Sequence, residues 1–568
     1  MTLRRCLVLT LLLLILAPAV RAAQPGTGGY WLLMSRRTAG QGDIWALATS
    51  GPAAGTWLRL TATPGDERWP ALSPDGHRLA YAARRDRNWD LYVLDLATGE
   101  ERRLTDDPHY DGWPSWSPDG RTLVFASMRE GDLDIFTLDL ASGEATNLTP
   151  GSKAHEYQPS YAPDGQSLLY ISTRRGEHDL FRLAVGSDRA EQITTAEGID
   201  ETAPHWAPDG RWVLVLAQAE LERYVARLDV ATGVLTRLTW TRGESDPVLS
   251  PGGREIAWAD RRASETAILS VDLGKQGLPH RLAGGLGLVQ DLAWVAADST
   301  LLQSAAARVP QEADPPTLEL PPAPGSGLVE VPNLDIDRPL LNAAVQPSYQ
   351  VLRERVRTEV GYDFLGRVSE THRPLHFASS ASDYLSWHKA GRAVDTLLDL
   401  GVPPSQLRME VVRDDRHNEV FWRIYLQCIP RDGSCGEPLL DRPWDFSARA
   451  RRVESPGKGG HPSSFFPGYW FDFTAAADDF GWFRIASYQD PDFDWRTDKT
   501  ALEFWHYQMD AGLDWWSAMK EIYDAPTLAD WFSWKTLEEH HIPLWLLRIK
   551  GVPIPPELRA RPVDLVVP

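Results

Sequence analysis

The tetrapeptide Ser73-Pro-Asp-Gly76 decides the fold, because the chain repeats its pattern four more times at a nearly constant spacing. The further copies follow at intervals of 44, 45, 45 and 43 residues: Ser117-Pro-Asp-Gly120, Ala162-Pro-Asp-Gly165, Ala207-Pro-Asp-Gly210 and Ser250-Pro-Gly-Gly253. In each copy, proline fixes φ at the first corner of a turn, and glycine accepts a positive φ at a later one. A turn that recurs with this period predicts an architecture built from structural repeats.

Two further signals recur in phase with the turn. An aspartate precedes an aromatic residue by two positions in four units: Asp43-Ile-Trp45, Asp90-Leu-Tyr92, Asp134-Ile-Phe136 and Asp179-Leu-Phe181. A tripeptide ending in threonine closes each unit: Arg59-Leu-Thr61, Arg103-Leu-Thr105, Asn147-Leu-Thr149, Gln192-Ile-Thr194 and Arg237-Leu-Thr239. The apolar, β-branched runs between these signals are typical of strands. Four short strands per unit predict the blades of a β-propeller.

We expect the propeller over residues 29–305. Five clear turns and a degenerate one near Trp294 give six blades, and the ambiguous ends leave seven open. The chain enters partway through a unit at Tyr30, so this strand can complete the blade begun by the last segment and close the ring. The repeated aspartates are interpreted as turn caps rather than calcium ligands, because closely alternating carboxylates are missing from the sequence.

The repeat resembles the TolB-type, WD40-like (PD40) propeller repeats written around Ser-Pro-Asp-Gly, over nearly half of the chain. This resemblance implies the fold and says little about function, because propellers serve in binding, scaffolding and catalysis. Some propellers cap serine peptidases of the prolyl oligopeptidase type. The sequence contains no Gly-x-Ser-x-Gly nucleophile motif, which argues against that class.

Composition and the first residues indicate an exported protein of more than one domain. At 568 residues the chain is too long for one core, and its formal charge of −20 argues against a nucleic-acid partner. Residues 1–22 read as a signal peptide, with Arg4 and Arg5 before an apolar run and a small-residue cleavage site. A single-pass anchor is the alternative, but the run is short for a bilayer. We therefore expect a periplasmic, cell-envelope or extracellular protein without stable membrane insertion.

Two cysteines, Cys428 and Cys435, remain after removal of the signal peptide, and they flank a turn-rich stretch. An oxidising compartment favours a disulfide between them, and two unpaired thiols are the alternative.

Residues 306–346 are rich in proline and predict a linker, so independent placement of two domains is expected. Residues 347–568 predict a C-terminal α+β domain with a small antiparallel sheet. Leu352, Val356 and Val360 recur at helical spacing. Further expected elements are strands over 419–426 and 480–486 and a helix over 513–523.

Two segments of this domain carry the parts of a hydrolytic zinc site: Ser386-Trp-His388-Lys-Ala-Gly391-Arg-Ala393-Val-Asp395 and Glu503-Phe-Trp505-His506. Gly391, Ala393 and Asp395 at alternate positions would share one face of a strand. His388 could turn back toward Asp395, and His506 could complete the set from a second strand. A catalytic zinc needs three such ligands, with a separate carboxylate to accept a proton from water. A core histidine and a surface carboxylate are the alternative reading.

The two segments resemble the M15 family of zinc peptidases, which includes D-Ala-D-Ala carboxypeptidases and dipeptidases acting on cell-wall peptides. The resemblance implies Zn²⁺ ligands at His388, Asp395 and His506, and a general base at Glu503. Arg373 is the best-placed match to the substrate-binding arginine of that family. The sequence departs from the family in a long gap between the two segments, where 449–464 has no counterpart.

The sequence as a whole predicts an exported zinc-dependent peptidase-like protein with a propeller for binding. It would hydrolyse peptide bonds in peptides with a free C-terminus, with peptidoglycan stem peptides as candidate substrates and a protein as candidate partner of the propeller. The alternative is a non-catalytic, TolB-like envelope binding or scaffold protein. A third hypothesis is carbohydrate recognition, because half of the 24 tryptophans lie between Trp387 and Trp545.

Overall fold

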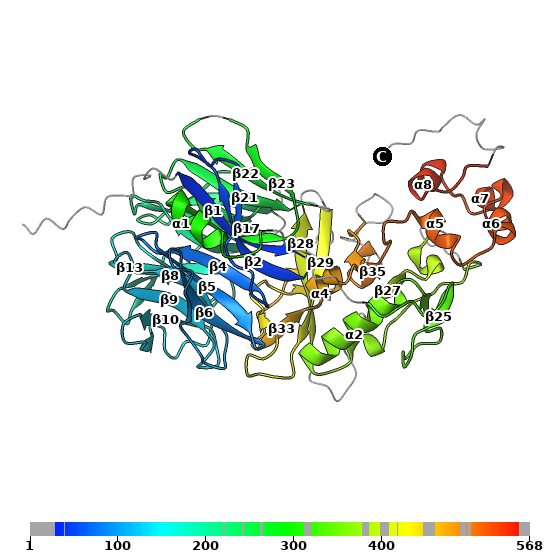
Figure 1. The fold of residues 1–568 in the computed structure, drawn as a ribbon, viewed down its shortest axis with the longest axis horizontal. Coiled ribbons are helices and arrows are strands. Elements are labelled where there is room, and N and C mark those ends of the chain that lie inside the picture. Colours follow the sequence, from blue (N-terminus) through cyan, green and yellow to red (C-terminus); the bar gives the residue numbers. More distant parts are fainter. Residues whose placement is uncertain are drawn as a thin grey trace, which may run out of the picture.

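The repeated turns fold into six four-stranded antiparallel sheets around one axis, with the C-terminal part on one side of this ring (Figure 1). This computed structural model describes residues 29–38, 40–219, 222–240, 244–261, 265–275, 277–311, 320–377, 385–397, 408–416, 419–446, 461–488, 496 and 501–555. The predicted signal peptide lies outside these ranges, and so export stays a prediction. Within them, no helix has both the length and the apolar character needed to cross a bilayer.

Within the described residues, the number of blades is the predicted six. The first sheet has the order β24 (Val289–Ala296), β1 (Tyr30–Thr38), β2 (Gln41–Ala48) and β3 (Trp57–Arg59). The next two blades comprise β4 (Glu67–Leu72), β5 (Arg78–Arg85), β6 (Asn88–Asp95), β7 (Glu101–Arg103), β8 (Asp111–Trp116), β9 (Thr122–Ser127), β10 (Asp134–Asp139) and β11 (Ala145–Asn147). The last three comprise β12 (Glu156–Tyr161), β13 (Ser167–Ser172), β14 (Asp179–Ala184), β15 (Ala190–Gln192), β16 (Ile199–Trp206), β17 (Trp212–Ala219), β18 (Glu222–Asp229), β19 (Leu235–Arg237), β20 (Glu244–Leu249), β21 (Glu255–Arg261), β22 (Thr266–Asp272) and β23 (His280–Leu286).

The N-terminal strand closes the ring as predicted. β1 pairs antiparallel with β2 on one side and with β24 on the other, so Trp31 lies opposite Val295. The first and last repeats therefore share one blade.

The recurring threonine and aspartate hold each blade together. In five of the six blades the threonine hydroxyl accepts a hydrogen bond from a backbone N–H of the third strand, as between Thr105 and Leu91 at 3.0 Å. The aspartate pairs with the first residue of the threonine tripeptide, as Asp90 does with Arg103 at 2.7 Å. The role is structural, as predicted, but these aspartates lie in strands and pair with side chains of the same blade, and they are not the expected turn caps.

The innermost strands carry a repeat that our sequence reading missed. An acidic residue, two variable residues and a proline begin five of these strands, at Glu67, Asp111, Glu156, Glu201 and Glu244. All five acids are fully buried. The residue before each proline has a positive φ of 50–54°, and each strand has a register shift at this point. The acid-x-x-Pro spacing equals that of the turns, and so the sequence did contain the signal.

The C-terminal part combines short helices with small antiparallel sheets, which agrees with the predicted α+β class. Its main sheet has the order β28 (Met409–Arg416), β29 (Glu419–Gln427), β33 (Tyr469–Asp472) and β30 (Glu437–Pro438). A smaller sheet has the order β27 (Ala393–Asp395), β35 (His506–Gln508) and β34 (Phe483–Arg484). The other elements of this part are β25 (Leu328–Glu330), β26 (Leu340–Asn342), α2 (Gln346–Val360), η1 (Phe364–Gly366), η2 (Trp387–Ala390), β31 (Trp444–Asp445), β32 (His461–Pro462), α4 (Phe473–Asp479), α5 (Trp515–Met519), α6 (Ala525–Trp531), α7 (Trp534–Glu539) and α8 (Leu544–Ile549). Helix α1 (Ser299–Ala306) follows β24 and packs on the first blade, in one cluster with Trp31 and Leu60.

Three local expectations need correction. Residues 328–342 of the predicted linker form the β25–β26 hairpin, because Leu341 is apolar enough to be fully buried. Only Phe483–Arg484 of the strand expected over 480–486 is extended, since Gly481 has a left-handed φ of 80°. The helix expected over 513–523 is limited to Trp515–Met519, beginning at the Asp514 cap.

The two parts are not independently placed, contrary to the expectation from the linker. The main C-terminal sheet lies against the propeller (Figure 1). Arg37 binds Asp479 at 2.6 Å, and Arg84 binds Glu359 at 2.7 Å. Arg68 bridges Asp291 of the propeller at 2.9 Å and Glu437 of the C-terminal sheet at 3.1 Å. These partly buried pairs join segments hundreds of residues apart.

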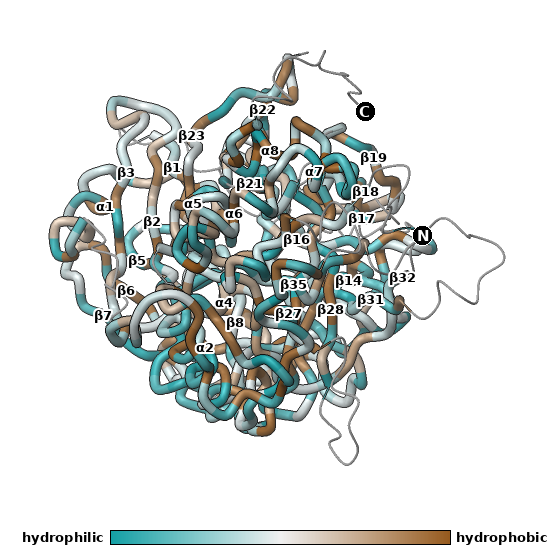
Figure 2. Tube along the Cα trace, turned by 90° about the vertical axis from the view of Figure 1, so that its right-hand side faces the viewer, coloured by the Kyte–Doolittle hydropathy of each residue, from teal (hydrophilic) through white to brown (hydrophobic). Residues whose placement is uncertain are grey.

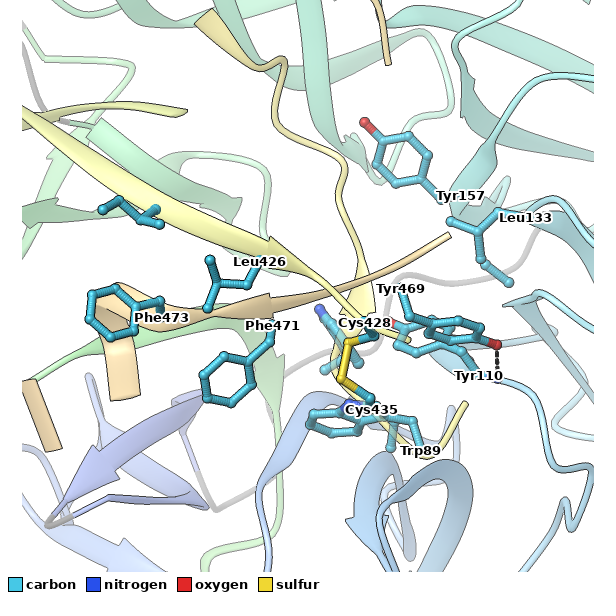
Figure 3. Close-up of a cluster of buried hydrophobic side chains, with 14 of the residues drawn as sticks. Trp89, Tyr110, Leu133, Tyr157, Leu426, Cys428, Cys435, Tyr469, Phe471 and Phe473 are labelled. Atoms are coloured by element: carbon cyan, nitrogen blue, oxygen red, sulfur yellow. Dashed lines mark hydrogen bonds between the residues drawn. A yellow bond between two sulfur atoms is a disulfide. The ribbon is translucent and has the colours of Figure 1, made fainter. Parts of the chain in front are cut away.

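A disulfide between Cys428 and Cys435 forms part of this contact. Figure 3 shows it beside Trp89 and Tyr110 of the propeller, in one buried hydrophobic cluster that both parts share. The backbone N–H of Tyr110 donates to the Tyr469 hydroxyl at 3.1 Å. The disulfide reading of the two cysteines is therefore the one that the structure contains.

We predict that the buried acids make stability depend on pH. Burial raises the pKa of Glu67 from 4.5 to about 8. The folded chain then binds more protons than the unfolded chain between these values, so stability falls as pH rises through this window. The E67Q variant should lose this part of the dependence and gain stability relative to the wild type from pH 5 to pH 9 in urea unfolding. E144Q, at an exposed turn, is the control. A pH-independent difference between E67Q and wild type would contradict the prediction.

Candidate metal site

The local backbone geometry explains why the first motif contains serine and glycine at these positions. Ser386 caps the short helix η2 by accepting a hydrogen bond from the His388 N–H at 3.3 Å. Gly391 ends this helix with a left-handed φ of 62°, and a Cβ there would lie 2.6 Å from Leu328 Cδ2. Gly391 is therefore a turn residue and not, as expected, part of the strand, which spans only Ala393–Asp395.

Strand pairing then brings the second motif to the first. β27 runs antiparallel to β35, and Asp395 lies directly opposite His506. The two strands lie side by side in Figure 2. Val394 points into the main core cluster, whereas Ala393 packs in a separate cluster, as the alternation predicted.

His388, Asp395 and His506 form a possible metal-binding triad. His388 Nε2 lies 3.0 Å from Asp395 Oδ1, and His506 Nδ1 lies 2.9 Å from the same oxygen. One ligand atom from each residue falls within 4.8 Å of the others. Both histidines are buried, with exposed fractions of 1% and 8%.

The outer nitrogen of each histidine faces an oxygen acceptor. His388 Nδ1 donates to the Thr371 carbonyl at 2.6 Å, and His506 Nε2 lies 3.2 Å from Gln508 Oε1. A neutral ring that donates outward presents a lone pair inward. Two such nitrogens and a carboxylate oxygen lie close enough together to hold a cation.

In the metal-free triad, the pKa values of Asp395 and His388 are shifted by the attraction between the two groups. Burial acts to raise the pKa of Asp395, but the His388 charge and hydrogen bonds from both histidines outweigh it and hold that pKa far below its usual range. Burial acts to lower the pKa of His388, and the Asp395 carboxylate outweighs it in the opposite direction. A metal ion bound to these groups would displace protons from them.

The structure places the other two predicted site residues near the triad's backbone. The Arg373 N–H donates to the His388 carbonyl at 3.2 Å, but its guanidinium pairs with Glu370 (Nε to Oε1 2.7 Å). Glu503 is half-buried with a left-handed φ of 57°, and its carbonyl accepts from the His506 N–H at 3.2 Å. Glu503 therefore begins the turn that carries His506.

Sequence reading missed Thr371, Gln508 and Glu370. Gln508 could have been found, because alternate residues of a strand share a face and it follows His506 by two. Thr371 acts through its backbone, so its side-chain identity carried no signal.

Comparisons with known proteins identify the propeller. Residues 65–297 match the PD40 family, the TolB beta propeller domain. TolB from Acinetobacter baumannii is 22% identical over 48% of this chain and 67% of its own, with a TM-score of 0.42. The structure of putative TolB from Agrobacterium tumefaciens is 20% identical over 47% and 92%, with a TM-score of 0.37. A structure of oligogalacturonate lyase in complex with manganese is 17% identical over 44% and 78%, with a TM-score of 0.34.

No curated protein sequence matches the chain. The family match shows that the chain contains a TolB-type β-propeller. The family match ends at residue 297, before the metal site.

We predict that G391A lowers the free energy of unfolding by about 2–4 kcal/mol, through left-handed strain and steric overlap with Leu328. G143A is the matched control, because Gly143 has a φ of 76° and nothing within 4 Å of its would-be Cβ. Its loss should be about 1 kcal/mol. Equal losses in urea unfolding of the two variants would show that the contact with Leu328 does not constrain the motif.

Proposed function

We propose that the C-terminal part is a zinc-dependent hydrolase of peptide bonds, of the type that its two motifs resemble in the M15 peptidases. The observation that carries the proposal is that a nitrogen of each histidine ring lies within 3.0 Å of the same Asp395 oxygen, with the other ring nitrogen facing an oxygen atom. A two-histidine, one-carboxylate set suits zinc.

His388, Asp395 and His506 would hold the ion, and the Thr371 carbonyl and Gln508 would fix the orientation of the two rings. Zinc at this place supplies a Lewis acid that polarises a carbonyl group and makes water more acidic. Glu503 is assigned as general base, accepting the proton of the attacking water and returning it to the leaving amine. Its position in the turn before His506 is consistent with that role.

The substrate is proposed to be a peptide with a free C-terminal carboxylate, with peptidoglycan stem peptides as the candidate. Arg373 is assigned to bind that carboxylate, and in the structure its guanidinium pairs with Glu370 through Nε and Nη2. The propeller would bind a partner protein or the substrate-bearing polymer outside the cytoplasm. These assignments rest on the motif resemblance and on the predicted signal peptide.

Metal content tests the site before any activity is sought. Elemental mass spectrometry of the purified mature protein should find about one zinc per chain, and H388A/H506A should contain none. H372A is the matched control, because His372 is half-buried, bonds to the Tyr523 hydroxyl at 3.1 Å and lies outside the triad. Absence of zinc from the wild type, even after incubation with the ion, would exclude the hydrolase and favour the envelope binding or scaffold protein.

Hydrolysis of N-acylated peptides ending in D-Ala-D-Ala tests the chemistry. E503Q should keep its zinc and lose at least a hundredfold in kcat, because general-base catalysis contributes about 10²–10⁴. Full activity in E503Q would remove Glu503 from its assigned role. Zinc binding without hydrolysis of any peptide would favour a structural metal site.

A further inference from the structure

Arg392 lies inside the first motif, three residues before Asp395, and is not one of the triad. Its Nη2 donates to Glu521 Oε2 at 2.8 Å. Its Nη1 lies 3.4 Å from the carbonyl oxygens of Met509 and Asp510, the two residues that directly follow β35. The guanidinium therefore joins the start of β27 to the end of β35, the two strands that carry triad residues.

Glu521 receives a second hydrogen bond from strand β26. Asn342 Nδ2 donates to Glu521 Oε2 at 3.0 Å, and the backbone N–H of Asn342 donates to the Gly391 carbonyl at 2.8 Å. Asn342 is buried. One carboxylate oxygen thus binds both Arg392 and the residue that holds the Gly391 turn from the other side.

Helix α5 fixes the position of Glu521. This residue follows α5 by two positions, and its N–H donates to the Ala518 carbonyl at 3.2 Å. The helix contacts the first motif through Trp515, whose Nε1 donates to the Ser386 carbonyl at 2.9 Å. Trp515 and Ala518 share one buried cluster with Trp387 of η2. Packing of α5 on η2 therefore presents the Glu521 carboxylate to the motif.

The strand pairing that builds the triad is short. β27 and β35 pair over three residues, with Asp395 opposite His506. A shift of the register by one residue would move His506 to the face opposite Asp395 and separate the two ligands. So short a pairing specifies little of the register by itself, and contacts at its ends contribute to it.

The buried arginine depends on its carboxylate partner. The exposed fraction is 2% for the Arg392 side chain and 38% for that of Glu521. Ion pairs with both partners exposed contribute little, but removal of the partner of a buried charge leaves that charge uncompensated. Without Glu521 the guanidinium would turn toward water, and the backbone that moves with it leads to Asp395 within three residues. The effect of the loss therefore falls on the geometry of the triad.

We propose that Glu521 is a positioning residue for the metal site. By binding Arg392 and Asn342, it holds the Gly391 turn and the register of β27 against β35, so that the triad residues meet. Helix α5 is then part of the framework of the metal site. The proposal rests on the proposed function, because it concerns the same triad.

The zinc affinity of the full mature protein tests the proposal, measured by competition with a chromophoric chelator. E521A should weaken zinc binding about ten- to a hundredfold, the usual effect of losing a group that orients metal ligands. E521Q keeps an acceptor oxygen for both donors and should lose less. E539A is the matched control, because Glu539 is exposed and pairs with Lys535 on the surface of α7.

Bound Co²⁺ separates positioning from stability, because its visible absorption depends on the number and geometry of its ligands. E521A should alter the spectrum of the Co²⁺-loaded protein, and E539A should leave it unchanged. A variant that only unfolds more easily would bind less Co²⁺ with an unaltered spectrum, and this outcome in E521A would overturn the proposal. Should E521A not fold, E521Q decides by the same two measurements.

The failure of this proposal and the failure of the proposed function give different results. Wild-type protein that binds neither ion would remove the metal site itself, and with it the role of Glu521. Wild-type binding, with the same zinc affinity and Co²⁺ spectrum in E521A as in E539A, would overturn the positioning role and leave the metal site intact.

Discussion

The pairing of β1 with β24 closes the ring, and the interior of the molecule depends on this closure. It places the first and last repeats in one sheet and brings six inner strands around one axis. Asp291 of β24 then forms an ion pair with Arg68 of β4, and Arg68 also pairs with Glu437 of the main C-terminal sheet. An open ring would lose this bridge, and it would also expose two unpaired strand edges. The cavity of about 680 Å³ between the propeller and the main C-terminal sheet is therefore a product of ring closure followed by docking of that sheet.

The triad depends on a comparable constraint at smaller scale. Asp395 and His506 are 111 residues apart, and a three-residue strand pairing places them opposite each other. Gly391 allows the chain to turn sharply enough for His388 to meet the same carboxylate. Each residue is fixed by backbone geometry before any ion binds, and such preorganisation lowers the cost of assembling a metal site.

The features that could be predicted from the sequence are those determined by residues near one another in the chain or in the repeat. The turns, ring closure and disulfide depend on residues close together in the chain or in a fixed repeat. The triad could be predicted because its turn and strand are encoded by Ser386, Gly391 and Ala393. Docking could not, because Arg37 and Asp479 are separated by 442 residues and nothing in either neighbourhood specifies the other. The cavity between the propeller and the main C-terminal sheet was missed for the same reason, although the acid-x-x-Pro repeat marked the inner strands that line it.

Strand β29 of the main C-terminal sheet lies between the cavity beneath this sheet and the turn that carries His506. Arg423 faces this cavity, and its neighbour Trp422 donates from Nε1 to Ser487 Oγ at 2.7 Å on the opposite side. Ser487 Oγ donates to the Leu502 carbonyl at 2.6 Å, immediately before Glu503. The strand that lines the cavity is thus joined through two hydrogen bonds to the turn that carries His506, so the two faces of the C-terminal part form one framework.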